Sequence, residues 1–227
     1  MLDTGVGAHS SHTPSLPPQA MPTQTLNFST ADDSEELARA ELYGLLARLW
    51  LAPPDAALRE QFDVAVTQAP QPGAFLEGPW QTLVAAMRTT TPQQAAEEYD
   101  ALFLGVGKPE VFLYGSFYLT GFLNEKPLAQ LRDELTKMGL ARSGNRHETE
   151  DHVSALCDVM RFLIAGDADT PPAALDLQHE FFRRHIEPWY AGLATVIIGA
   201  NQTNFYKHVA HFMREFFAIE NAAFDIT

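Results

Sequence analysis

The densest group of side chains that could do chemistry lies at His147–His152, which reads HETEDH. Histidines and acids this close together could transfer protons, hold a metal ion or bind a cation. The spacing predicts a helix that Thr149 caps, with Glu150 and Asp151 in its first turn and Gly166 at its end. Its apolar stripe consists of Val153, Leu156, Cys157, Met160, Leu163 and Ile164. The chemistry therefore lies at the entrance of a helix whose other face is core.

No nucleophile accompanies this cluster. The G-x-S-x-G turn of a serine hydrolase is absent from the sequence. Acids at a helix start are more often caps than catalysts, because they favour the positive end of the helix dipole. We expect no catalytic residues. A metal-dependent helical-bundle hydrolase that uses His147, Glu148, Asp151 and His152 stays the alternative.

Metal and nucleotide motifs are also missing. The sequence contains neither H-E-x-x-H nor the Glu-x-x-His pairs of a di-iron bundle. His208, His211 and Glu215 share one helix face, but such trios arise by chance on amphipathic helices. No Walker loop and no G-x-G-x-x-G occurs. We expect no metal and no cofactor.

Binding is the role that remains for the cluster. Tyr114 and Tyr118 could offer amphipathic aromatic surface, and Glu148, Glu150 and Asp151 could accept hydrogen bonds from guanidinium groups. Such a site suits a peptide that carries arginine next to apolar residues. Composition alone favours the plainer alternative, in which the tyrosines are core and the acids are solvated caps.

Composition limits the kinds of partner that the chain can bind and the cellular compartment in which we expect it. The formal net charge is −14, from 29 acidic against 15 basic residues, which argues against nucleic acid and anionic membranes. The lone cysteine, Cys157, lies on an apolar stripe and is expected to be a buried thiol. We see no secretory signal and no apolar run long enough to cross a bilayer. We therefore expect a cytoplasmic protein with no stable membrane association.

Periodicity predicts one all-α domain of nine or ten helices over residues 32–227, after a flexible tail over residues 1–31 that is rich in Pro, Ser and Thr. Proline and glycine mark most helix boundaries. The aromatic segment 111–123 has no partner strand and is expected to be a buried loop or short helix. The predicted helices start near 32, 55, 80, 92, 127, 150, 170, 191 and 203, and the second runs to about 68.

Three blocks of sequence carry a resemblance. The first is EYDALF at 98–103 followed by YGSFYL at 114–119. The second is EDH at 150–152, followed by Ala155, Leu156 and Met160. The third is QHEFFRRHIEPW at 178–189. In order and spacing these blocks resemble the TorD/DmsD family of molybdoenzyme maturation chaperones, in the NarJ-like superfamily.

The resemblance implies an all-helical fold without catalysis. It implies that the chain binds the twin-arginine signal peptide, or the apoprotein, of a molybdopterin oxidoreductase until its cofactor is inserted. A chaperone for a non-exported apo-oxidoreductase, which ignores signal peptides, is the alternative. Some members bind guanine nucleotide, for which this sequence shows no phosphate loop. The resemblance leaves open whether the chain is a monomer or a homodimer.

The resemblance also implies a set of binding residues. By matching position, Asp151 and His152 form the polar binding pair, and Glu150 stands beside them. The residues expected to line the peptide-binding side are Leu102, Phe103, Tyr114, Gly115, Ser116 and Tyr118.

Overall fold

The computed structural model describes residues 31–68, 76–105, 108–141 and 147–225. These residues form ten α-helices and no strand, which confirms the predicted all-α class. The elements are α1 (Ala31–Leu51), α2 (Ala56–Asp63), α3 (Glu77–Thr89), α4 (Pro92–Tyr99), the π-helical turn η1 (Asp100–Leu104), α5 (Gly115–Thr120), α6 (Lys126–Lys137), α7 (Val153–Ala165), α8 (Leu175–His185), α9 (Glu187–Gly199) and α10 (Tyr206–Phe224).

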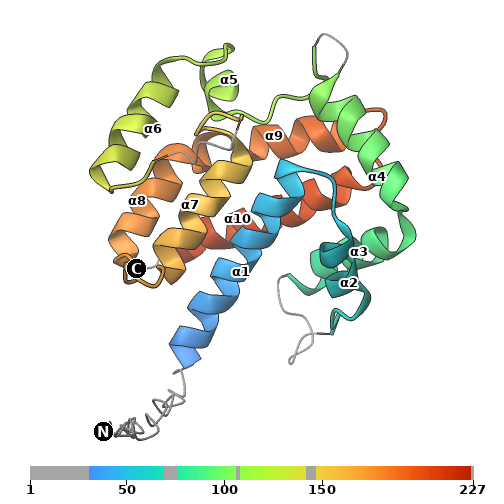
Figure 1. The fold of residues 1–227 in the computed structure, drawn as a ribbon, viewed down its shortest axis with the longest axis horizontal. Helices are drawn as coiled ribbons and strands as arrows, with labels where there is room; N and C mark the ends of the chain where they lie inside the picture. Colours follow the sequence, from blue (N-terminus) through green and yellow to red (C-terminus); the bar gives the residue numbers. More distant parts are fainter. Residues whose placement is uncertain (1–30, 69–75, 106–107, 142–146, 226–227) are drawn as a thin grey trace, which may run out of the picture.

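The centre of the molecule is the pair α1 and α7, which run side by side (Figure 1). Ser154 Oγ donates to the Ala47 carbonyl at 2.7 Å, so the two helices approach closely. α10 packs against both α9 and α1, and α5 and α6 lie at the opposite end of the molecule from α2 and α3. Cys157 is fully buried in this core, and burial raises the pKa of its thiol. The expectation of a buried structural thiol is confirmed.

Local signals define most helix ends. Thr91 and Gln94 form a capping box at the start of α4, with bonds of 3.2 and 2.9 Å. Gly166 ends α7 with a φ of 66°. α8 ends at His185 and α9 begins at Glu187, with Pro188 in the first turn of α9. The predicted second helix is too long, because α2 ends at Asp63 and leaves residues 64–68 outside any helix.

The predicted start of α7 is wrong. Thr149 is not its cap, and Glu150 and Asp151 do not lie in its first turn, because α7 begins at Val153. His152 is the N-cap, and its Nδ1 accepts a hydrogen bond from the Ser154 amide at 3.2 Å. The preceding residues form a turn in which the His152 amide donates to the Thr149 carbonyl at 3.0 Å, and the backbone on either side of His152 bonds to a distant segment, which no local capping pattern reveals.

Two expectations fall mainly outside the described residues. The tail predicted over 1–31 is one of them, so the division into a tail and a helical domain stays a prediction. The polar loop at 142–146 is the other. Among the described helices, none is long and apolar enough to cross a membrane.

Candidate functional site

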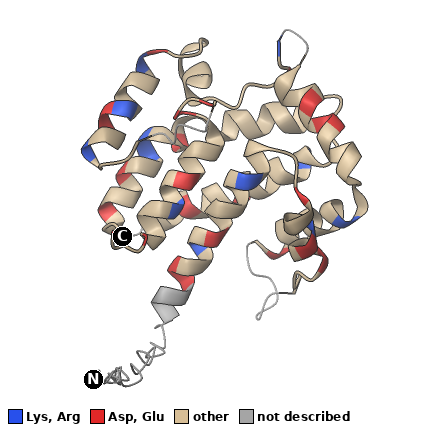
Figure 2. Ribbon diagram, in the orientation of Figure 1, with Lys and Arg blue, Asp and Glu red and all other residues tan. Residues whose placement is uncertain are grey.

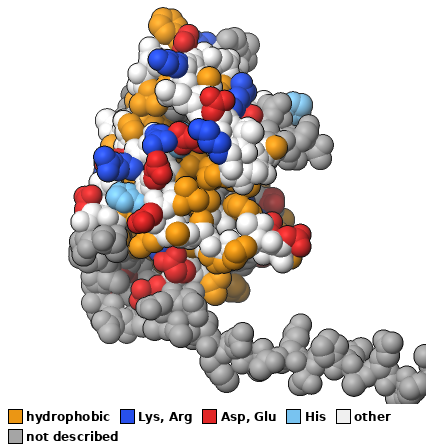
Figure 3. Space-filling view, turned by 90° about the vertical axis from the view of Figure 1, so that its left-hand side faces the viewer, with side chains coloured by type: hydrophobic (Ala, Val, Ile, Leu, Met, Phe, Trp, Pro, Cys, Tyr) orange, Lys and Arg blue, Asp and Glu red, His pale blue; other side chains and the backbone are white. Residues whose placement is uncertain are grey.

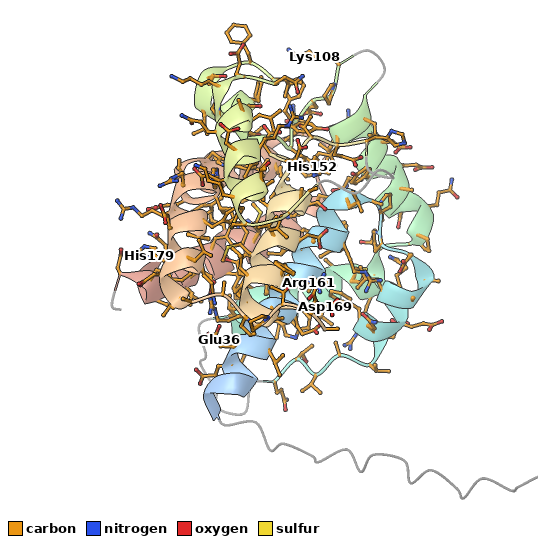
Figure 4. All side chains as sticks on the ribbon, turned by 60° about the vertical axis from the view of Figure 1, so that its left-hand side comes forward. Glu36, Lys108, His152, Arg161, Asp169 and His179 are labelled. Carbon is orange, nitrogen blue, oxygen red and sulfur yellow. The ribbon has the colours of Figure 1, made fainter. Side chains whose placement is uncertain are left out.

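The polar cluster lies where two distant segments cross. The Gly115 amide donates to the Asp151 carbonyl and the Val153 amide donates to the Leu113 carbonyl, both at 2.9 Å. The two bonds flank an isolated antiparallel bridge between Tyr114 and His152, whose rings meet edge to face at 5.0 Å. Figure 4 shows His152 at the start of α7, close to α6. The predicted aromatic and polar segments are therefore brought together.

Asp151 holds this crossing in place with its side chain. The carboxylate is 3% exposed. Its Oδ2 accepts from the Ser116 amide at 2.9 Å, and its Oδ1 accepts from Thr149 Oγ at 2.6 Å. Ser116 lies in the first turn of α5, whose own cap Tyr114 offers no side-chain acceptor. The Asp151 carboxylate lies outside α5 and thus caps this helix in place of Tyr114.

All three blocks of the resemblance contribute to a small cavity of about 100 Å³. Its floor includes the Trp189 indole, against which Gly115 packs so closely that a Cβ at Gly115 would lie 3.0 Å from Nε1. Tyr118 stacks on the same indole at 5.5 Å. Ser116 Oγ is buried and has no hydrogen-bond partner among the described residues. The cavity is lined by Gly115, Ser116, Leu119, Pro127, Gln130, Leu131, Asp151, Leu156, Arg184, His185 and Trp189.

A larger pocket of about 200 Å³ opens beside the turn that precedes α7, between α1, α6 and α7. Its apolar lining is Leu51, Leu135, Leu140, Ala141, Ala155 and Val159. Its polar lining is Glu148, Glu150, His152, Ser154 and Asp158. We call it the acidic pocket, because three carboxylates border an apolar interior. Glu150 and His152 line this pocket while Asp151 lines the small cavity, so alternate residues of one segment serve two sites.

The carboxylates around the acidic pocket affect the pKa of two neighbouring tyrosines. Burial raises the pKa of Tyr114, and the nearby Glu148 and Asp151 carboxylates raise it further. Burial and Glu148 likewise raise the pKa of Tyr99. Both phenols therefore stay protonated and can donate hydrogen bonds. The local potential is negative, which favours a cationic ligand.

The remaining predicted residues lie deeper. Leu102 is fully buried, and its carbonyl accepts from the Val111 amide at 2.8 Å, which anchors the segment that leads to Tyr114. Phe103 packs edge to face against Trp50 at 6.0 Å. Both belong to the core beneath the crossing, and their part in peptide binding stays a prediction.

Sequence reasoning missed the contribution of α6. Leu135 lines the acidic pocket, and Arg132 Nε donates to Glu150 Oε2 at 2.8 Å. Leu135 was predicted as a stripe residue of its own helix, but no local pattern indicates which neighbour that stripe covers. Among the described residues, no three His, Cys, Asp or Glu side chains are grouped so as to hold a metal ion.

Asp151→Ala should lower the free energy of unfolding by about 2 kcal/mol, because it removes two hydrogen bonds to a buried carboxylate and leaves the Ser116 amide unpaired. Asp151→Asn should cost about half as much, since its carbonyl oxygen still accepts from that amide. Urea denaturation measures both. Asp133→Ala, at an exposed acid on α6, is the matched control and should change stability by less than about 0.5 kcal/mol. Equal losses at the two positions would mean that Asp151 does not hold the crossing.

Comparison with known proteins identifies the fold and the family. The family model described as nitrate reductase delta subunit matches residues 71–195, more than half of the chain. The chaperone protein TorD of Vibrio cholerae is 28% identical over 176 residues, which cover 69% of this chain and 78% of that protein. TorD of Aliivibrio fischeri is 27% identical over 125 residues, and the match spans 58% of its length. A redox enzyme maturation protein from Archaeoglobus fulgidus superposes with a TM-score of 0.53 at 16% identity, covering 86% of this chain and 99% of the solved one.

The curated relatives are chaperones, which is the class of protein that this chain resembles, and the solved maturation protein has the same fold. Within that class, the chain belongs to the nitrate reductase delta subunit family, in which the TorD-like chaperones are its relatives. The resemblance carried by the three sequence blocks is thereby confirmed.

Proposed function

We propose that this chain is a cytoplasmic chaperone that binds the twin-arginine signal peptide, or the apoprotein, of a molybdopterin oxidoreductase and assists cofactor insertion before export. The observation that carries the proposal is the acidic pocket, which combines three carboxylates with an apolar lining at the crossing of two signature blocks. A twin-arginine segment offers the complementary chemistry, because it places guanidinium groups next to apolar side chains.

The size of the acidic pocket also fits a peptide. At about 200 Å³ it is smaller than the roughly 300–1,000 Å³ that small-molecule and cofactor sites occupy. It can take a side chain or two of an extended segment, while the rest of that segment lies on the surface. Figure 3 shows hydrophobic side chains in the middle of one face with acidic and basic side chains around them, a surface suited to such a segment.

Within the proposed site the residues divide into two roles. Glu150, His152 and Tyr114 are the groups that we expect to touch the peptide, together with Tyr118 at the neighbouring cavity. Asp151, Gly115 and Ser116 hold the segments that present those groups, with Leu102 and Phe103 beneath them. The net charge of −14 attracts a basic peptide and disfavours nucleic acid, so the partner is the client, bound by a monomer or a homodimer.

Titration of a twin-arginine peptide tests the proposal. The peptide should come from the molybdopterin oxidoreductase encoded nearest to this gene, and its matched control carries two lysines in place of the arginines. We expect the lysine peptide to bind about tenfold more weakly, because an ammonium group cannot pair bidentately with a carboxylate. Glu148→Gln should weaken arginine-peptide binding, whereas Glu97→Gln, which changes the net charge equally at a distant exposed site, should not. Failure of every twin-arginine peptide to bind would contradict the proposal.

The second candidate is a chaperone that holds a non-exported apoprotein. The buried position of Leu102, Phe103 and Asp151 favours it, because these predicted contacts offer little surface to a short peptide. Deleting the signal peptide from the client separates the two candidates. Binding that survives the deletion with unchanged affinity supports the second candidate, and binding that is lost supports the first.

A further inference from the structure

An arginine of the chain itself already contacts the acidic pocket. Arg132 projects from α6, the helix on which basic side chains recur at Lys126, Arg132 and Lys137 (Figure 2). Its Nε lies 2.8 Å from Oε2 of Glu150, one of the three carboxylates of the pocket. The Glu150 side chain is 15% exposed, whereas that of Arg132 is 49% exposed. The acid is thus part of the pocket wall, and its partner reaches it from the solvent side.

The geometry of this pair is that of an exchangeable contact. One hydrogen bond joins the two side chains, through Nε alone, rather than the two parallel bonds of a bidentate pair. A half-exposed arginine regains full hydration when it leaves, and such pairs contribute little to stability. An external guanidinium group that pairs bidentately with Glu150 therefore has an advantage over Arg132.

α6 itself does not depend on this contact. Glu134, two residues further along the helix, accepts from His185 at 2.7 Å and from Arg184 at 2.6 Å, both on α8. These bonds keep α6 docked when Arg132 swings away. Release of Arg132 is consequently a side-chain movement that requires no opening of the fold.

We infer that Arg132 pairs with the Glu150 carboxylate while no ligand is bound. An arginine of the bound peptide then displaces Arg132 and pairs with that carboxylate in its place. The inference rests on the proposed function for the identity of the peptide, but the exchange at Glu150 is a property of the chain itself. Arg132 keeps the acid neutralised while the pocket is empty. Arg132 also makes the site selective, because only a group that pairs with the carboxylate more strongly than a single Nε contact replaces Arg132.

The size of the effect follows from the strength of the pair. The apparent affinity for the peptide equals its intrinsic affinity multiplied by the fraction of molecules in which Glu150 is free of Arg132. For an ion pair with one exposed partner, removal of Arg132 should tighten binding by about two- to fivefold. Removal of Glu150 should weaken binding and abolish the effect of Arg132.

A double-mutant cycle tests the exchange. The affinity of a labelled twin-arginine peptide is measured by fluorescence anisotropy for wild type, Arg132→Gln, Glu150→Gln and the double variant. Lys137→Gln, which removes the same charge from an exposed position on the same helix, is the control. We expect tighter binding for Arg132→Gln alone, no change for Lys137→Gln, and no effect of Arg132→Gln in the Glu150→Gln background. Equal gains in Arg132→Gln and Lys137→Gln, or a gain that persists without Glu150, would overturn the inference.

A second measurement separates this inference from the proposed function. Blocked arginine, Nα-acetylarginine methylamide, is added to protein with carboxyl-labelled glutamate, and blocked lysine serves as the control ligand. The Glu150 carboxyl resonance, assigned by its loss in Glu150→Gln, should shift with the arginine compound and half-saturate at lower concentration in Arg132→Gln. A Glu150 signal that ignores blocked arginine overturns the inference, whatever the peptide does. A Glu150 signal that responds, while no twin-arginine peptide binds, upholds the exchange and contradicts the proposed function instead.

Discussion

Glu220→Ala should lower the free energy of unfolding by about 3–5 kcal/mol, the largest loss that we expect from a single substitution. Glu220 lies on α10 with a side chain that is 3% exposed, and both of its oxygens accept from Arg39 on α1, at 2.9 and 2.8 Å. Tyr43 donates to the same carboxylate at 3.1 Å. Truncation leaves Nε and Nη2 of the largely buried Arg39 and a buried hydroxyl without their acceptor, while Glu36 still accepts from Nη1 at 2.6 Å.

The pKa shifts of Arg39 and Tyr43 have the directions that their contacts with Glu220 imply. Burial lowers the pKa of Arg39, but the hydrogen bonds and charges of Glu220 and Glu36 outweigh it, so the net shift is upward. Burial, followed by the charge of Glu220, raises the pKa of Tyr43, which therefore stays a donor. The guanidinium group also reaches Gln178 on α8 at 3.4 Å. One ion pair thus ties together α1, α8 and α10.

Chemical denaturation with urea measures the loss. Glu215→Ala, at a half-exposed acid on the same helix, is the matched control and should cost less than about 0.5 kcal/mol. The double variant Arg39→Met, Glu220→Leu should recover most of the lost stability, because it removes both charges and refills the space with apolar atoms. A double variant as unstable as Glu220→Ala would show that the unpaired charge is not the cause.

Glu98→Ala should cost about 2–4 kcal/mol, because one buried carboxylate serves three backbone donors at the start of α10. Its oxygens accept from the amides of Asn204, Phe205 and Tyr206 at 2.8–2.9 Å. These are orphan donors of the helix terminus, and the negative charge also suits the positive end of its dipole. Glu98 lines a polar pocket, so water can replace part of what the carboxylate supplies, and this keeps the loss below that of Glu220→Ala.

Amide hydrogen exchange gives a local readout of this cap. In Glu98→Ala, the amides of Phe205 and Tyr206 should exchange faster than in wild type by more than the global loss of stability explains. Glu97→Ala changes the adjacent exposed acid and should leave both the exchange rates and the unfolding free energy nearly unchanged. Unaltered exchange at these amides in Glu98→Ala would contradict the capping role.

Sequence patterns predicted what short-range chemistry determines. The helix start at Pro92 and the stop at Gly166 both depend on residues within four positions of one another, and both are present. The apolar stripe of α7 is buried as its period required. These features follow from helix geometry and backbone sterics, which a sequence carries explicitly.

The site depended on contacts that no local pattern contains. α7 starts at Val153 rather than at Glu150 because the backbone of Asp151–Val153 bonds to a segment roughly 35 residues earlier, as the separation of Asp151 and Ser116 shows. Glu98 caps a helix that begins 108 residues later at Tyr206. The three blocks mark segments that the fold brings together around the small cavity, but their contacts became visible only in the structure.

The turn before α7 divides one short segment between two sites. The His152 amide donates to the Thr149 carbonyl at 3.0 Å, so residues 149–152 form a turn rather than a strand. Within this turn, Glu150 and His152 line the acidic pocket, whereas Asp151 between them lines the small cavity. Each residue of a turn is placed by its own backbone conformation, so a shift by two residues does not restore the arrangement. Loss or gain of one or two residues ahead of the Tyr114–His152 bridge would therefore displace the ligand-facing acid, and the length of this segment should be fixed.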